Sequence, residues 1–323
     1  MREVAFLKNN AEKWKQFESY LSKSKDYNSD QLAELFIQLT DDLAYSKTFY
    51  PKSKTTLYLN SLASKVHRRI YKNKKEEKST FIYFWSKVLP SLFYKHRREL
   101  LISFSIFMIA LIIGIFSAAN NDSFVRLILG DSYINMTSEN MSKGDPMAVY
   151  KQMNQVDMFL GITFNNIRVS FFAFILGILF SFGTAYILFS NGIMLGAFEY
   201  FFFQKGFLIQ SLLAVWLHGT LEISAIIIAG GAGITIGNSI LFPGTYSRGQ
   251  SFIAAAQDGV RIVIGLIPIF ISAGFLESFL TRYTEMPIIL NLIIIFGSLS
   301  FIIWYVIIYP SKQFKRGTNH DPN

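Results

Sequence analysis

Two ionisable residues, His218 and Glu222, stand four positions apart inside an otherwise apolar stretch over residues 207–237. On a continuous helix this spacing places both side chains on one face, where they can hydrogen-bond to each other. The stretch exceeds the roughly 20 apolar residues that cross a hydrocarbon core of about 30 Å. An unpaired ionisable side chain costs roughly 2.5 kcal/mol or more at that depth, so the pair should face a protein interior or a wet cavity. We therefore expect the functional centre here.

Glu277, near the end of a second apolar stretch over residues 260–280, is the third candidate for this intramembrane polar cluster. One interpretation is a buried hydrogen-bonded network that fixes helix register, which is favourable only if every polar group is satisfied. A second is a transport or lipid-handling site, which typically combines half-helices with polar groups at the membrane midplane. A third is an intramembrane hydrolase, because one His and two carboxylates can bind zinc and activate water.

The sequence favours the network and supports the hydrolase least. The pattern HGxxE lacks the second His of HExxH, and the other histidines, His67, His96 and His320, lie outside the apolar half of the chain. Zero cysteines also remove thiolate chemistry and Cys-ligated metals. We therefore expect no catalytic residue, no metal ligand, no stoichiometric zinc and no cofactor.

Further polar residues in the apolar half could support the cluster, namely Asn191, Glu199, Asp258 and Arg261. Asp258 and Arg261 stand three apart, so they can pair on one helix face. A run of glycines follows the His218 motif, at Gly230, Gly231, Gly233 and Gly237. They match neither GxGxxG nor a Walker loop, so we expect them to permit close helix packing. Together with small residues over 177–183, they also lead us to expect a homo-oligomer.

The composition is that of a multi-pass membrane protein, because 51% of the residues are hydrophobic and only 16% are charged. Most lysines and arginines precede residue 99, just before the first apolar span. This asymmetry is the positive-inside signal, with attraction to anionic membrane lipids as a secondary effect. We therefore expect a cytoplasmic N-terminus and no nucleic-acid partner. The fold class expected is all-α, a multi-pass helical membrane bundle with a small N-terminal helical domain.

The N-terminal part, residues 1–80, reads as a cytoplasmic domain of three helices with one buried stripe each. Its expected core includes Phe6, Trp14, Leu39, Leu57 and Leu59. An aromatic-rich interfacial helix should follow over residues 81–98. The transmembrane domain is expected over residues 99–310 and a cytoplasmic tail over 311–323.

Hydropathy predicts five clean spans, over residues 100–119, 169–189, 207–237, 260–280 and 287–309. An external segment should occupy residues 120–166. The apolar run 193–203 is too short to cross and could be a half-helix or re-entrant segment. Basic residues at both ends favour an even number of crossings, so the count stays open at about five or six.

Several motifs resemble the stage II sporulation protein M family of integral membrane proteins, in its non-sporulation branch. These are Asn191-Gly-Ile-Met-Leu-Gly196, His218-Gly-x-x-Glu222, Ala273-Gly-Phe-Leu-Glu277-Ser-Phe-Leu-Thr281 and, in the soluble part, Leu39-Thr-Asp-Asp-Leu-Ala-Tyr45. The resemblance spans nearly the whole chain. It departs from the family pattern at Arg282, where a proline is expected after Thr281.

The resemblance implies a bacterial cell (inner) membrane protein without established catalysis. Sporulation members of the family are scaffolds for peptidoglycan-degrading enzymes, and members with a similar N-terminal domain tend to be encoded beside a MoxR-type ATPase and an RDD-family membrane protein. We therefore expect a non-enzymatic scaffold or assembly partner in a cell-envelope complex. The alternative is a transporter or lipid-handling protein with its polar site at His218, Glu222 and Glu277.

Overall fold

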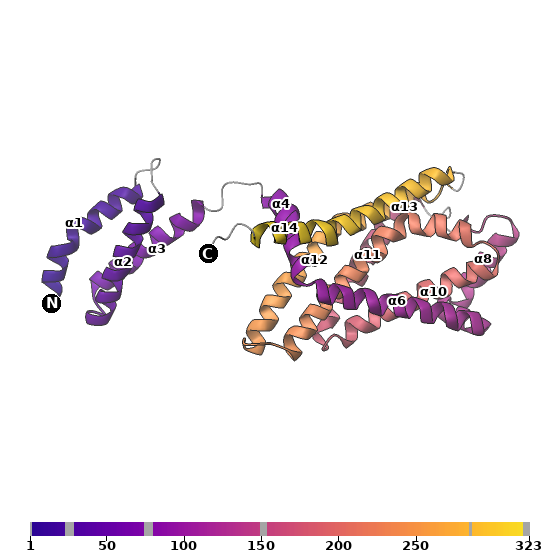
Figure 1. The fold of residues 1–323 in the computed structure, drawn as a ribbon, viewed down its shortest axis with the longest axis horizontal. Coiled ribbons are helices and arrows are strands. Elements are labelled where there is room, and N and C mark those ends of the chain that lie inside the picture. Colours follow the sequence, from indigo (N-terminus) through magenta and orange to yellow (C-terminus); the bar gives the residue numbers. More distant parts are fainter. Residues whose placement is uncertain (1, 23–28, 74–79, 149–153, 284–285, 319–323) are drawn as a thin grey trace. The chain divides into compact units, whose positions relative to one another are not determined.

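The computed structural model describes residues 2–22, 29–73, 80–148, 154–283 and 286–318, and these are almost entirely helical (Figure 1). The prediction of an all-α fold is confirmed, since the described residues contain no strand. The chain divides into two compact units, Met1–Ile82 and Tyr83–Asn323. Each unit is considered by itself.

The first unit contains three helices, α1 (Glu3–Ser22), α2 (Ser29–Phe49) and α3 (Lys54–Asn73). Their buried stripes meet in one core, whose members include Phe6, Trp14, Phe17, Leu39, Leu43, Leu59, Leu62 and Val66. The expected core position of Leu57 is wrong, because this side chain is 70% exposed. Leu59 and Leu62 already define the buried face of α3, and Leu57 lies off it.

The described residues of the second unit contain six helices that are long and apolar enough to cross a membrane. They are α6 (Arg97–Asn120), α9 (Gln155–Ile175) with η3 (Leu176–Ile178), α10 (Phe182–Gln204), α11 (Leu208–Leu241), α12 (Arg248–Phe275) with η4 (Leu276–Leu280), and α13 (Ile288–Ile303), which continues through η5 (Trp304–Ile308) into α14 (Tyr309–Thr318). Figure 1 shows these helices running back and forth along the unit.

The predicted span over residues 169–189 is wrong, because the chain reverses direction in its middle. The turn lies between η3 and α10, where Phe180 and Ser181 have φ values of 51° and 68°. This left-handed backbone normally favours glycine. Here a Phe and a Ser adopt it, so neither a glycine nor a break in hydropathy marks the turn in the sequence. The run 193–203 is consequently the second half of α10 and not a half-helix.

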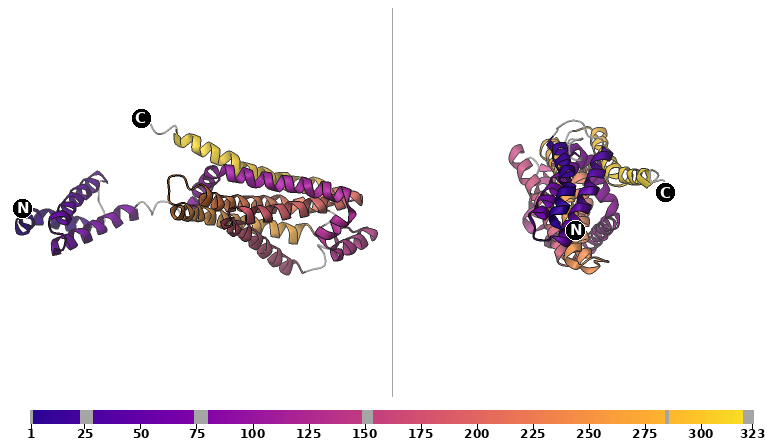
Figure 2. Two further views of the ribbon diagram at one scale, coloured as in Figure 1. Left: turned by 90° about the horizontal axis from the view of Figure 1, so that it is seen from below. Right: turned by 90° about the vertical axis from the view of Figure 1, so that its left-hand side faces the viewer.

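The start and the end of the second unit lie side by side. Ahead of α6 come α4 (Thr80–Tyr83), η1 (Phe84–Val88) and α5 (Leu89–Lys95). Tyr94 of α5 stacks on Phe314 of α14 with ring centroids 4.3 Å apart, and the Tyr305 hydroxyl donates to the Trp85 carbonyl over 2.6 Å. The six candidate spans among the described residues therefore begin and finish at one end of the bundle (Figure 1 and Figure 2). Six candidate spans fit the even number of crossings that the basic ends favour, and the count itself stays a prediction.

The stretch expected as an external segment over 120–166 is largely helical. It holds α7 (Asp122–Leu129) and α8 (Asp131–Ser142), which pack with the end of α10 in a separate small core. The stretch also ends earlier than expected, because α9 already begins at Gln155. Residues 155–166 thus belong to a candidate span. The polar residues Asn165 and Asn166 made this part of α9 look like a loop.

Close approach of backbones holds the bundle together. A Cβ on Gly177 would collide with the carbonyl of Gly233 on α11, and one on Gly196 would collide with the carbonyl of Leu111 on α6. Small residues let membrane helices approach to this distance, where dispersion contacts replace the hydrophobic effect as the driving force. The result is a bundle whose helices have little freedom to separate.

Candidate functional site

The polar cluster lies where α11 meets η4 at the end of α12. His218 and Glu222 come from successive turns of α11, and Glu277 comes from η4. One ligand atom from each of the three residues lies within 4.8 Å of the others. His218 is 5% exposed, and the side chain of Glu277 is 13% exposed. The structure therefore brings together the three residues singled out from the sequence.

The imidazole of His218 faces a different residue with each ring nitrogen. Nε2 lies 3.6 Å from Oε2 of Glu277, and Nδ1 lies 3.3 Å from Oγ1 of Thr281. A separation of 3.6 Å is too long for a hydrogen bond. The contact between His218 and Glu277 is thus one of proximity, not of direct hydrogen bonding.

A third helix, α9, lines the cluster with a polar stripe that the sequence analysis missed. Thr163, Asn166 and Ser170 recur at spacings of three and four, so they share one face of α9, and α9 packs against both α11 and η4. Asn166 is the polar neighbour of Glu222. Polar residues at helical spacing within an apolar stretch could have indicated this face of α9. The expected external segment over residues 120–166 divided the stripe, so the pattern was not recognised.

Several buried polar atoms of this region lack a hydrogen-bond partner among the described residues. They are Thr163 Oγ1, Asn166 Nδ2, Ser170 Oγ and Ser278 Oγ. Asn166 is 5% exposed, and its amide nitrogen does not reach hydrogen-bonding geometry with the nearby Glu222. Buried polar groups in proteins are nearly always satisfied by protein, water or a bound group, so this region has unused capacity for a ligand or water.

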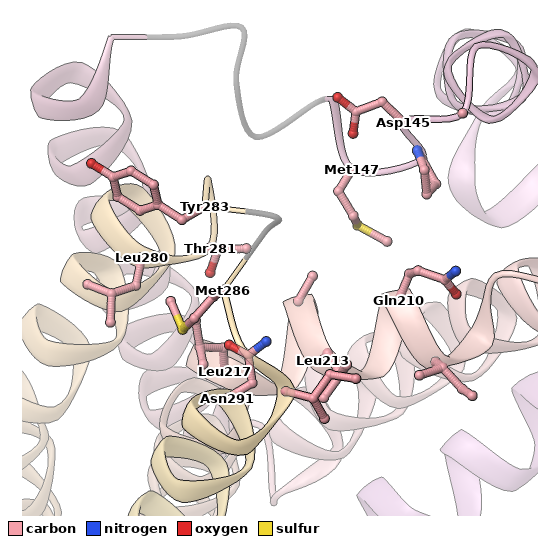
Figure 3. A pocket seen from close by; sticks show the side chains of 15 residues that line it. Asp145, Met147, Gln210, Leu213, Leu217, Leu280, Thr281, Tyr283, Met286 and Asn291 are labelled. Carbon is pink, nitrogen blue, oxygen red and sulfur yellow. The ribbon is translucent and has the colours of Figure 1, made fainter.

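A pocket of about 560 Å³ lies beside the cluster, although none of the three cluster residues lines it. Figure 3 shows it between α11, the segment that follows η4, and the loop that holds Asp145 and Met147. Its wall includes Leu217, next to His218 in the chain, and Thr281, whose hydroxyl contacts the imidazole. Thr281 therefore stands between the pocket and His218.

The four proposed supporting residues lie elsewhere. Asn191 donates to the Ile187 carbonyl of its own helix over 2.8 Å. Glu199 accepts from Ser211 Oγ and Trp216 Nε1, both over 3.0 Å, and so joins the end of α10 to the start of α11. Neither residue is a member of the three-residue cluster.

Asp258 and Arg261 form part of a second polar site, which includes two residues that the sequence analysis missed. Arg261 Nη1 lies 3.7 Å from Asp258 Oδ1, so the predicted pairing is within ion-pair distance. Shorter contacts come from outside α12, because Asp258 Oδ2 lies 2.6 Å from Lys95 Nζ and 3.0 Å from His96 Nε2. His96 is buried between α5 and α6. Lys95 was interpreted only as a basic flank of the membrane.

The glycines after His218 make contacts within the chain. Gly230 lies against Ser103 and Leu188, Gly231 against Leu100, and Gly237 against Ser181. Gly233 lies against Ala173 and Thr184. Because other helices of the same chain already occupy these positions, the glycine face is not a surface for self-association. A homo-oligomer stays a prediction that needs another surface.

Six long apolar helices among the described residues, with a buried polar cluster between three of the helical segments, define a multi-pass helical membrane protein. Residues 103–282, more than half of the chain, match the family described as Stage II sporulation protein M, and the chain belongs to this family. Residues 4–72 match a second family, described as a domain of unknown function (DUF8413). Comparison with curated proteins finds no match, and comparison with solved structures finds none either.

Proposed function

We propose that this protein is a non-enzymatic subunit that serves as a scaffold or assembly partner in a bacterial cell-envelope complex. The observation that carries the proposal is the closed bundle. Gly177 meets Gly233, Gly196 meets Leu111, and Gly114 meets Ile193, each without room for a Cβ. A rigid membrane unit of this kind suits a protein that holds partners in place.

The same helices give less support to transport. Transport sites of the expected type use discontinuous helices near the midplane. Here α10 continues through Gly192 and α11 continues through Gly219, so neither expected break occurs. Glu277 lies in η4, the last turn of its span, and not near the middle.

The first unit supports an assembly role, because it exposes large apolar side chains on all three of its helices. They are Val4, Ile37, Phe49 and Leu57, which are 77%, 60%, 58% and 70% exposed. A contiguous exposed apolar patch is typical of a protein-binding surface, and we propose that these side chains contribute to one. We propose that this unit contacts the partner, and the partners we would look for are a MoxR-type ATPase and an RDD-family membrane protein.

The experiment is gentle purification of the tagged protein from its native membrane, followed by mass spectrometry of co-purifying chains. An ATPase or envelope enzyme in fixed ratio is expected. Leu57→Ser should reduce its recovery, whereas the matched exposed change Lys54→Ser should not. A Glu222→Gln variant that stays folded, as judged by gel filtration, should keep the partner. Recovery of the protein alone, with a small molecule or lipid that Glu222→Gln releases, would contradict the proposal.

One observation favours lipid handling as a second candidate function. A pocket of about 690 Å³ lies between α6, α11 and the α13–α14 helix, and its lining includes Leu101, Phe104, Ile228 and Ile303. Arg97 and Arg98, at the start of α6, also line it. An apolar groove beside two cations fits the acyl chains and headgroup of an anionic lipid. Native mass spectrometry should then find a bound anionic lipid that Arg97→Gln together with Arg98→Gln removes.

A further inference from the structure

We propose that His218, Glu222 and Glu277 bind one divalent transition-metal ion of the zinc type within the membrane bundle. This inference does not depend on the scaffold role. It reverses the expectation of no metal, which rested on the absence of a second His near the motif. The structure supplies the third ligand from η4, far from the motif in the chain.

The spacing of the donor atoms suits a metal better than a direct hydrogen-bonded network. Zinc binds imidazole nitrogen and carboxylate oxygen at about 2.0–2.2 Å, so neighbouring ligand atoms of a tetrahedral site lie roughly 3.3 Å apart. His218 Nε2 and Glu277 Oε2 are 3.6 Å apart, and the atoms of all three residues lie within 4.8 Å of one another. These atoms are slightly too distant to bond to each other, yet they can converge on one ion by small side-chain rotations.

The charge of a divalent ion would also balance the charges of the two carboxylates. Among the described residues, no lysine or arginine forms an ion pair with Glu222 or Glu277. Two carboxylates buried together without a cation repel each other and are costly in a membrane interior. A divalent ion with two carboxylates and one neutral imidazole makes a site with no net charge.

Neighbouring groups are placed to hold the ligands. Thr281 Oγ1 faces Nδ1 of His218, so the opposite nitrogen, Nε2, is the one turned toward Glu277. Hydrogen bonds of this outer kind orient metal-binding imidazoles and carboxylates. The unpartnered amide of Asn166, 5% exposed and beside Glu222, provides a donor for the same purpose. Three protein ligands leave one position of a tetrahedral ion for water. Thr281, whose hydroxyl contacts His218, also lines the neighbouring pocket.

The test is the metal content of the full-length protein, purified without chelator in a mild detergent and measured by inductively coupled plasma mass spectrometry. About one zinc per chain is expected, as for a site with three protein ligands. His218→Ala and Glu277→Gln should each reduce the content at least about tenfold, because even changes to outer-shell partners weaken metal binding about 10–100-fold. Glu199→Gln is the matched control, because Glu199 is also an intramembrane carboxylate but lies outside the cluster, and it should keep the metal.

A second measurement covers the case in which the variants fail to fold. Wild-type protein stripped by a chelator is titrated with Co²⁺, which should give visible absorption bands of a tetrahedral site and a rise in the thermal unfolding midpoint that chelator reverses. The proposal is overturned if the titrated wild type shows neither response, in which case protonated carboxylates and water fill the cluster. It is also overturned if folded His218→Ala and Glu277→Gln keep the metal, because the ion is then bound elsewhere.

Discussion

Nε2 of His96 lies 3.0 Å from Oδ2 of Asp258, and this contact joins the start of the first membrane helix to α12. Both residues are buried, at 8% and 7% exposure. A carboxylate only accepts hydrogen bonds, so the ring nitrogen is the donor. Lys95 Nζ donates to the same oxygen over 2.6 Å. The buried carboxylate is thus satisfied by two neighbouring residues of the segment that leads into the membrane.

Replacing Asp258 with Ala should destabilise the membrane unit. The change leaves the buried His96 without its acceptor, and such losses cost about 1–3 kcal/mol. The side chain of Lys95 is 60% exposed, so its share is small. The thermal unfolding midpoint in detergent should therefore fall. Arg126→Ala is the control, because its pair with Asp131 is exposed, and an equal fall in both variants would contradict this role for Asp258.

Gly177→Ala should disrupt the packing of η3 against α11. The new Cβ would meet the Gly233 backbone, which cannot move aside as a flexible side chain could. Gly297→Ala in α13 adds the same methyl group in open space, where Ala is favoured over Gly in a helix by about 1 kcal/mol. The unfolding midpoint should fall in the first variant and hold or rise in the second. Similar behaviour of the pair would argue against close packing at Gly177.

Glu199→Ala should weaken the hairpin between α10 and α11. It removes the acceptor of both Ser211 and Trp216, and each lost hydrogen bond costs about 0.5–1.5 kcal/mol. Glu199→Gln keeps one acceptor oxygen, so its unfolding midpoint should lie between those of the wild type and Glu199→Ala. A midpoint for Glu199→Gln at or below that of Glu199→Ala would show that the hydrogen bonds are not the cause.

The six-span arrangement predicts which positions face the same side of the membrane. The natural chain has no cysteine, so single-cysteine variants can be labelled with a membrane-impermeant reagent. Ser142→Cys, at the end of α8, and Gly244→Cys, between α11 and α12, should be labelled from opposite sides. Lys8→Cys should behave like Gly244→Cys if the N-terminus is cytoplasmic. Labelling of Ser142→Cys and Gly244→Cys from one side would rule out this topology.

The sequence predicted the helices that have clear ends. Arg97 and Arg98 mark the entry of α6, and the apolar run around His218 gives α11 close to its true bounds. The pairing of His218 with Glu222 followed from helical spacing, whereas Glu277 entered through its motif and its place near the end of a span. Spacing within one helix is local information, and a sequence carries it directly.

What the sequence did not reveal depends on tertiary packing. The chain reverses direction at Phe180 and Ser181, and neither is a glycine or a proline. Both sides of the turn are apolar, so hydropathy predicted one continuous span. Asn166 looked like a loop residue, because its polar side chain is buried only by the arrival of α11 and η4. The hydrogen bond between His96 and Asp258 joins two segments that are far apart in the sequence, so helical spacing within one segment could not predict it.

The last helix, α13 with its continuation, contributes little to the core of the second unit. The family match ends at residue 282, before α13 begins at Ile288, and α13 with its continuation has few buried residues, 6% of its most apolar window. Gain or loss of a helix with so few buried residues would leave most of the core in place. Each gain or loss changes the parity of the crossings, and so transfers the tail that follows to the opposite compartment. In this protein Phe314 of α14 stacks on Tyr94 of α5, so the last helix returns to the segment that precedes the first candidate span.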